Sequence, residues 1–260
     1  MNQVMRAYAL YPSLAERRVV VTGGASGIGA AFVAAFAAQG AQVVFLDVAE
    51  APARDLAQGL AAAKYAPRFI ACDMTDLAAI GAAFARIDAE VGPVDILINN
   101  CANDDRHRID DVTPAYWDQR MAVNLRHLFF CAQAVLPGMR ASGGGAILNL
   151  GSISWHHALP NLSLYMTAKA AIEGMTRGMA RDLGPDGIRV NTIVPGAVRT
   201  PRQQQLWHTP DEEAKILAGQ CLQKRVDVED VAALALFLAS DNASSCTGRE
   251  YFVDAGWYGT

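Results

Sequence analysis

Short apolar runs alternate with longer helical patterns along nearly the whole chain, and this alternation limits the possible folds more than any other feature. The runs with strand character are Arg18–Thr22, Gln42–Asp47, Arg68–Ala71, Val94–Asn99, Ala146–Gly151, Ile188–Val194 and Glu250–Val253. The segments with helical character are Ile28–Gln39, Ala51–Ala63, Leu77–Val91, Pro114–Arg140, Ser163–Asp182 and Val228–Ser240. Inner runs such as VVFLD, DILIN and RVNTIV are continuously apolar, which is typical of parallel strands covered on both faces. We therefore predict an α/β fold: a single-domain, Rossmann-type, doubly wound sheet of seven parallel strands with helices on both faces.

Size, charge and cysteine content exclude several other classes of protein. The 260 residues, 52% of them hydrophobic, fit one large domain over residues 18–260 after a tail over residues 1–17. A net charge of −4 without a long basic run argues against a nucleic-acid partner. No apolar segment is long enough to cross a bilayer, so we expect no membrane partner. Five scattered cysteines without a CxxC pair predict neither a disulfide framework nor a metal site, and they favour a reducing, cytoplasmic compartment.

A glycine-rich turn, TGGASGIG, follows the first predicted strand. Gly23, Gly27 and Gly29 allow a tight turn from strand to helix and let the backbone approach a pyrophosphate closely. The helix that follows would direct free N–H groups at the phosphates. On its own, this glycine pattern could be a structural turn. Its position between VVVT and an alanine-rich helix favours a dinucleotide-binding site that includes Ser26 and Ile28.

Asp47 ends the second predicted strand, eighteen residues after Gly29. A carboxylate at this place can accept hydrogen bonds from both hydroxyls of an adenosine ribose, whereas a 2′-phosphate would meet like charge. The following residues, Val48 and Ala49, are not basic. The sequence therefore predicts NAD rather than NADP as the cofactor, although Asp47 could also be a simple turn residue.

Ser152, Tyr165 and Lys169 form the candidate catalytic group. Tyr165 and Lys169 are four residues apart and share one face of a predicted helix, while Ser152 ends the apolar run AILNLGS. A tyrosine and a lysine at this spacing are most often a surface pair. A hydroxyl, a phenol and an ammonium beside a nucleotide site are instead suited to proton transfer during hydride chemistry.

The order of these motifs resembles that of the short-chain dehydrogenase/reductase family from about Arg18 to about Trp257. The resemblance implies that Tyr165 is the general acid/base and that Ser152 holds the reacting oxygen. Lys169 would bind the ribose hydroxyls and lower the pKa of the phenol, together with the positive nicotinamide. Asn124, in MAVNLRH, matches the family asparagine that helps to hold a relay water, although it could be a polar helix residue facing solvent.

The resemblance also implies further cofactor contacts. Asp73 would contact the adenine, although it could instead be the N-cap of the next helix, a role open to Thr75 or Asp76 as well. Cys101 stands where the family has alanine, and we expect it to be a packing residue rather than a nucleophile. The remaining residues expected at the cofactor are Met74, Asn100, Ala102, Pro195, Gly196, Val198 and Thr200.

Polar and aromatic loops are expected to contact the substrate. The segments NDDRH, NLRH, GSISWH and CTG-x-EY-x-x-DAGW resemble those of bacterial NAD-dependent sugar dehydrogenases. The resemblance implies oxidation of an aldose at C1 to the aldonolactone, with D-xylose as the first candidate and L-arabinose as the second. The polar region Arg199–Gln223 is expected to be a substrate lid, or else a surface insertion. The expected substrate residues are Asn103, Asp104, His107, Ser152, Ser154, Trp155, His156, Tyr165 and Trp207.

Alternatives remain open at this point. The loops could be solvated surface or interface. The substrate could be another secondary alcohol or a 3-oxoacyl compound, and the chain could be an NAD-binding regulatory protein without turnover. The family resemblance also implies a homotetramer. The segment Pro114–Arg140 carries more apolar residues than one sheet-facing stripe needs, and the aromatic C-terminus could form a second contact.

Overall fold

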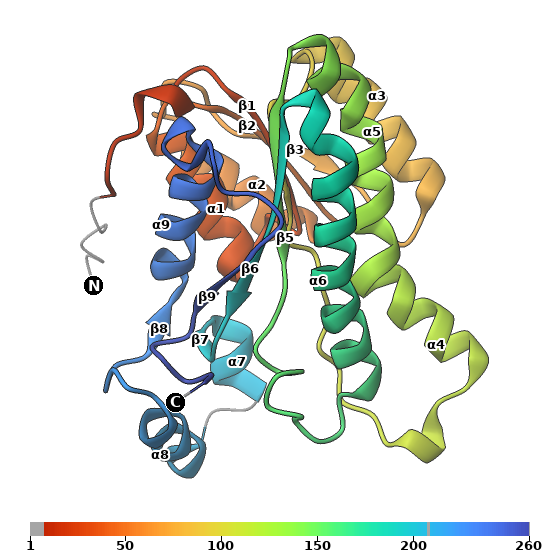
Figure 1. Cartoon of the computed structure of the whole chain (residues 1–260), viewed down its shortest axis with the longest axis vertical. Coiled ribbons are helices and arrows are strands. Elements are labelled where there is room, and N and C mark those ends of the chain that lie inside the picture. The colour runs from red at the N-terminus through yellow and green to blue at the C-terminus, as the bar shows by residue number, and fades with distance from the viewer. Residues whose placement is uncertain (1–7, 207–208, 260) are drawn as a thin grey trace.

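A computed structural model describes residues 8–206 and 209–259. Seven parallel strands form one sheet in the order β3-β2-β1-β4-β5-β6-β9 (Figure 1). Their bounds are β1 (Arg18–Thr22), β2 (Gln42–Asp47), β3 (Arg68–Ala71), β4 (Ile96–Asn99), β5 (Gly145–Leu150), β6 (Ile188–Pro195) and β9 (Glu250–Val253). The strand order reverses between β1 and β4, so the predicted doubly wound parallel sheet is confirmed.

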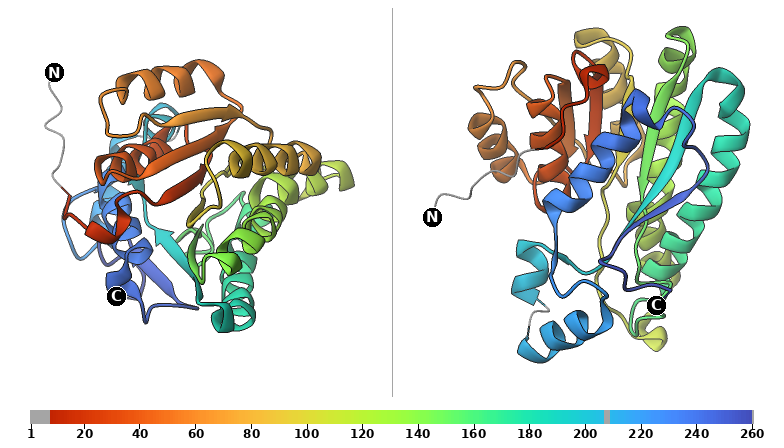
Figure 2. Two further views of the ribbon diagram at one scale, coloured as in Figure 1. Left: turned by 90° about the horizontal axis from the view of Figure 1, so that it is seen from above. Right: turned by 60° about the vertical axis from the view of Figure 1, so that its left-hand side comes forward.

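Helices cover both faces of this sheet (Figure 2). One layer consists of α1 (Gly27–Ala38), α2 (Glu50–Gly59) and α9 (Val228–Ala239), and the other of α3 (Leu77–Glu90), α5 (His127–Ala141) and α6 (Ser163–Leu183). The strand side chains alternate between the two layers, because Val19 and Val21 pack in one core and Val20 in the other. Burial on both sides explains why the inner strands are continuously apolar. Single 3₁₀ turns lie at Pro12–Leu14, Ile109–Asp111, Gly184–Asp186 and Asp241–Ala243.

The segment predicted as one helix over Pro114–Arg140 is helical throughout but contains a π-helical turn. It consists of α4 (Pro114–Met121), a π-helical turn at Ala122–Arg126, and α5. Asn124 lies in the π turn and is fully buried, which excludes the solvent-facing alternative. A π turn inserts one extra residue per turn and so re-aims the side chains around it, and such turns are frequent at functional sites.

The region after β6 forms a small cap at the carboxyl ends of the strands (Figure 1). It contains α7 (Pro201–Leu206), α8 (Pro210–Gly219) and a two-stranded sheet of β7 (Val198–Arg199) and β8 (Val226–Asp227). The predicted lid region therefore has secondary structure of its own. Trp207 lies outside the described residues.

Candidate active site

Ser152, Tyr165 and Lys169 meet beyond the carboxyl end of β5. The strand ends at Leu150 and leads directly to Ser152, while α6 begins at Ser163 and carries the other two residues. Lys169 donates from Nζ to the Leu150 carbonyl at 2.7 Å, and Nζ lies 5.3 Å from the centre of the Tyr165 ring. Lys169 is only 2% exposed. The pair is therefore part of the interior and not a surface pair.

The protein alone keeps the Tyr165 phenol neutral. Burial raises its pKa well above the usual range, and the negative charge of Asp104 raises it further, while a hydrogen bond with Ser152 and the charge of Arg106 lower it. Burial also lowers the pKa of Lys169 to about 8. A positive charge brought beside Tyr165, such as that of an oxidised nicotinamide, would favour the phenolate.

Asn124 connects this group to the loop after β4. Its Oδ1 accepts a hydrogen bond from the backbone N–H of Asn103 at 2.8 Å. Its Nδ2 is buried and has no hydrogen-bond partner among the described residues. A buried donor left unpaired costs about 1–3 kcal/mol, so this amide is suited to a ligand or a relay water.

The glycine turn packs tightly against the end of β4. Gly23 has φ +65°, and a Cβ on it would lie 2.8 Å from the Cα of Cys101. A Cβ on Gly29 would lie 1.9 Å from the Gly23 carbonyl oxygen. α1 begins at Gly27, and the Ser26 side chain makes no capping hydrogen bond, so the first amides of the helix have no side-chain oxygen on them. The turn therefore fits a phosphate-bearing cofactor, which these amides would hold.

Asn100 stabilises the glycine turn through hydrogen bonds from its side chain and its backbone. Its Nδ2 donates to the carbonyls of Thr22 and Gly23 at 3.0 and 2.9 Å, and its backbone N–H donates to Thr22 Oγ1. Both hydrogens of Nδ2 are thus used to fix the turn, so any contact of Asn100 with a cofactor would come from its Oδ1 or its backbone carbonyl. Burial raises the pKa of the neighbouring Cys101 thiol to about 12, so this thiol stays protonated, as a packing residue would.

Asp47 is fixed at the rim of the same turn. Its Oδ2 accepts from the Ala25 N–H and its Oδ1 from the Ala49 N–H, both at 2.9 Å. Asp47 therefore has a turn role, and each of its oxygens keeps a further lone pair for a ribose hydroxyl. Val48 beside it is 67% exposed.

The structure shows which residue is the N-cap of α3, one of the two roles expected for Asp73. Asp76 is the N-cap of α3, because its side chain accepts from the amides of Ala78 and Ala79. Asp73 instead accepts from the backbone N–H and the hydroxyl of Thr75, both at 2.8 Å. Met74 is 3% exposed and packs in the core beneath α3.

The segment from β6 to α7 lies across the glycine turn. Gly196 fits closely beside Asp254, since a Cβ there would lie 2.7 Å from the Asp254 Cα. The methyl group of Thr200 would be 3.6 Å from a Cβ on Gly27, so Thr200 lies beside the start of α1. Pro195 ends β6 and Val198 is buried in the short strand β7. These segments, far apart in sequence, thus form one site.

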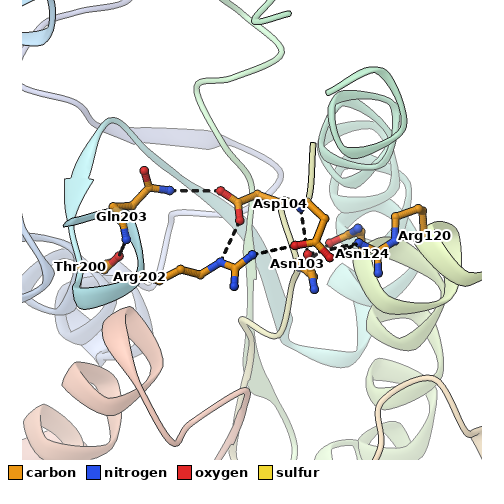
Figure 3. Close-up of polar contacts among 8 residues, drawn as sticks. Asn103, Asp104, Arg120, Asn124, Thr200, Arg202 and Gln203 are labelled. Atoms are coloured by element: carbon orange, nitrogen blue, oxygen red, sulfur yellow. Dashed lines mark hydrogen bonds and ion pairs between the residues drawn. The ribbon is translucent and has the colours of Figure 1, made fainter. Parts of the chain in front are cut away.

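The loop after β4 contacts Asn124 on one side and α7 on the other (Figure 3). Asp104 accepts hydrogen bonds from Arg202 and Gln203 of α7, each at 3.1 Å. His107 is bonded through Nε2 to the Ser163 hydroxyl at 3.0 Å, at the start of α6. The structure thus brings Asn103, Asp104 and His107 together with the catalytic group. Arg202 and Gln203 were not identified as site residues from the sequence, because they belong to no sequence motif.

Trp155 and His156 occupy a different place from the one expected. Trp155 Nε1 and His156 Nε2 both contact Glu173 Oε1, at 2.9 and 3.0 Å. The His156 ring also packs against Phe252 and Tyr258. The polar atoms of both side chains therefore belong to a cluster that joins the loop after Ser152 to α6 and the C-terminal segment. Nearness to Ser152 in sequence did not indicate this, because a loop has no fixed side-chain period.

Ser154 contacts the catalytic group through its backbone N–H. Its N–H donates to Ser152 Oγ at 3.1 Å and so orients the catalytic hydroxyl. Its own hydroxyl is buried without a hydrogen-bond partner among the described residues.

Comparison with known proteins agrees with this geometry. A family model described as enoyl-(acyl carrier protein) reductase matches residues 23–258. D-xylose 1-dehydrogenase of Caulobacter vibrioides is 59% identical over 249 residues, which cover 96% of this chain and 98% of that protein. A probable galactose dehydrogenase of Rhizobium meliloti is 45% identical, with 95% and 96% covered.

A solved structure of a 7α-hydroxysteroid dehydrogenase, in complex with NADH and 7-oxo glycochenodeoxycholic acid, superposes with a TM-score of 0.90 at 30% identity and covers 96% of this chain and 98% of that one. Within the described residues, no helix has both the length and the apolar character needed to cross a membrane. Ser152, Tyr165 and the buried Lys169 lie beside a glycine turn. Together with these matches over nearly the full length, they show that the chain is an oxidoreductase of the short-chain dehydrogenase/reductase family.

Proposed function

We propose that the protein oxidises an aldose at C1 to the aldonolactone, with NAD as the hydride acceptor. The observation that carries this proposal is the catalytic group of Ser152, Tyr165 and Lys169, with a carboxylate, Asp104, close enough to influence Tyr165. Such a site offers both a base for one hydroxyl and hydrogen-bond acceptors for others. The 59% identity to a D-xylose 1-dehydrogenase makes D-xylose the first candidate, followed by L-arabinose.

Each residue has a defined task in this reaction. Ser152 donates a hydrogen bond to the reacting oxygen, and Tyr165 removes its proton. Lys169 uses the hydrogens not bonded to the Leu150 carbonyl to hold the ribose of the cofactor, and Asn124 supports proton transfer toward solvent. When bound, the oxidised nicotinamide accepts the hydride and supplies positive charge that favours the Tyr165 phenolate.

Asp47 supports NAD as the cofactor rather than NADP. Its fixed carboxylate lies where a ribose hydroxyl would bind, and no basic residue follows it directly. A 2′-phosphate at this place would meet like charge.

A screen for NADH formation over pentoses, hexoses and simple secondary alcohols tests the proposal. We expect turnover of a pentose, with lactone appearing alongside NADH and slow hydrolysis to the aldonic acid. A ketose product would contradict oxidation at C1. Turnover of only cyclic or acyclic alcohols would point to a different dehydrogenase, and binding of NAD without turnover of any alcohol would point to a regulatory protein.

We also propose that the enzyme is a cytoplasmic homotetramer. Its five cysteines are free thiols, as is usual in a reducing compartment. Trp117 on α4 and Phe129 on α5 are 43% and 46% exposed, and Phe252 and Tyr258 are exposed at the C-terminus. Large apolar side chains in two exposed groups are suited to two kinds of subunit contact.

A further inference from the structure

Arg202 of α7 bridges two neighbouring carboxylates in the loop after β4 (Figure 3). Its Nε donates to Asp104 Oδ1 at 3.1 Å and its Nη2 to Asp105 Oδ1 at 2.8 Å. Gln203 adds a hydrogen bond from Nε2 to the other oxygen of Asp104, at 3.1 Å. The two elements are almost one hundred residues apart in the sequence, so the bridge fixes α7 to a distant part of the site. A planar guanidinium that contacts two carboxylates holds direction as well as distance.

The opposite side of the loop is held by a buried arginine. Arg120 of α4 is 4% exposed, and its Nη1 donates to Asn103 Oδ1 at 3.1 Å and to Asp105 Oδ2 at 3.2 Å. Asp105 is therefore shared between two arginines, one on each side of the loop. Because Asn103 also donates its N–H to Asn124, the contacts run without a break from α7 to the π turn of the catalytic site.

The bridge also changes the charge beside the catalytic base. The charged groups that face Tyr165 are Lys169, Asp104 and Arg106, and the negative charge of Asp104 raises the pKa of Tyr165. Asp104 also acts on Lys169, whose protonated form it favours. Arg202 pairs with Asp104 and so offsets part of this negative charge. Closing α7 onto the loop and preparing the base are thus linked through one side chain.

We propose that Arg202 is a positioning residue that locks α7 over the substrate site through Asp104 and Asp105 and, by pairing with Asp104, eases ionisation of Tyr165. The kinetic part of this proposal rests on the proposed oxidation of an alcohol. The locking part does not depend on any substrate.

The locking role is tested by hydrogen–deuterium exchange of the full-length protein, read on peptides covering residues 199–206. We expect Arg202→Gln to speed exchange of the α7 amides by roughly three- to tenfold, because an ion-pair network that restrains a short helix is lost. High salt should reduce the difference between the variant and the parent, since screening weakens the bridge in the parent. Parental exchange in Arg202→Gln would overturn the proposal.

The charge role is tested by the pH dependence of kcat/KM for whichever alcohol the enzyme oxidises. With Asp104 no longer offset, the Tyr165 pKa rises, so the alkaline rise in kcat/KM of Arg202→Gln should move up by roughly half a pH unit. Arg202→Lys keeps the charge but loses the two-nitrogen bridge. It should leave the pH profile near that of the parent while KM for the substrate rises by about three- to tenfold.

Arg199→Gln is the matched control. Arg199 is as exposed as Arg202, at 49%, and lies three residues before it, but it pairs with Asp227 at 2.8 Å and not with the loop. It should leave the pH profile unchanged. An equal pH shift in Arg199→Gln would show a general loss of charge and refute the specific role of Arg202. If no alcohol is oxidised, the proposed function fails, and the exchange measurements still decide whether the lock exists.

Discussion

We propose that Asp47 sets the choice between NAD and NADP, because backbone amides fix its carboxylate at the rim of the glycine turn. We expect the parent to prefer NAD by roughly a hundredfold or more in kcat/KM, since a 2′-phosphate would be placed against a negative charge. Asp47→Ala should narrow this preference, mainly by weakening NAD binding. Asp88→Ala, which removes an exposed carboxylate on α3, is the control and should keep the parental preference. Equal use of the two cofactors by the parent would contradict the prediction.

We propose Tyr165 as the catalytic base, so its hydroxyl should be indispensable for turnover. Tyr165→Phe removes the proton acceptor and little cofactor contact, and kcat should fall by about 10²–10⁴-fold while the dissociation constant for NADH stays near that of the parent. Lys169→Met should weaken both turnover and NADH binding. Tyr65→Phe, at the far end of the sheet, is the control and should leave both unchanged. Activity of Tyr165→Phe within about tenfold of the parent would point to another base.

Lys169 should also make the stability of the fold depend on pH. Burial lowers its folded-state pKa to about 8, below the usual 10.5, so between these values the unfolded chain binds more protons than the native one. The free energy of unfolding of the parent should therefore rise with pH across this window. In Lys169→Met this contribution is lost. Urea unfolding of both proteins at pH 7.5 and at pH 10 gives their free energies of unfolding. The difference between parent and variant should change by about 1–3 kcal/mol, in favour of the parent, from the lower to the higher pH.

At the scale of elements, the two loops beside the catalytic group have different tasks. We propose that the loop after β4 faces the substrate, so Asn103→Ala should raise KM for the sugar by roughly ten- to a hundredfold through lost hydrogen bonds. The loop that follows Ser152 carries Trp155 and His156, and both of these side chains contact Glu173. His156→Ala should therefore lower the unfolding free energy by about 1–3 kcal/mol and leave KM nearly unchanged. Measuring both quantities for both variants checks the division, and a large KM effect in His156→Ala would refute it.

The strands were predictable to within a residue or two, because burial on both faces requires continuous apolar runs. The π turn at Ala122–Arg126 was not, since AVNLR keeps the helical pattern of its neighbours and the extra residue arises from packing. The placing of Tyr165 and Lys169 on one face of one helix followed from their spacing, whereas their roles and those of Ser152 and Asn124 came from the family resemblance. The contact between Arg202 and Asp104 could not be predicted, because it joins polar residues 98 positions apart that belong to no sequence pattern. The contacts of Trp155 and His156 with Glu173 could not be predicted either, since loop residues have no period that fixes their direction.

At the scale of the whole molecule, the exposed apolar side chains predict assembly. Phe129 on α5 is 46% exposed, although α5 also packs on the sheet through fully buried residues such as Leu128 and Cys131. A large aromatic group on the outer side of a helix that already buries its inner side is typical of a subunit contact. We expect light scattering at micromolar concentration to give the mass of a tetramer.

Phe129→Glu should split this tetramer, because a buried unpaired carboxylate at a subunit contact is strongly unfavourable. Leu10→Glu is the matched control, since Leu10 is an apolar side chain that is 79% exposed near the start of the chain and has no such packed helix beneath it. The control should keep the mass of the parent. Phe129→Glu should give dimers or monomers that retain the secondary structure of the parent by circular dichroism, which separates loss of assembly from loss of folding. A parent that is monomeric, or a Phe129→Glu variant that remains tetrameric, would show that the α5 face is not a subunit contact.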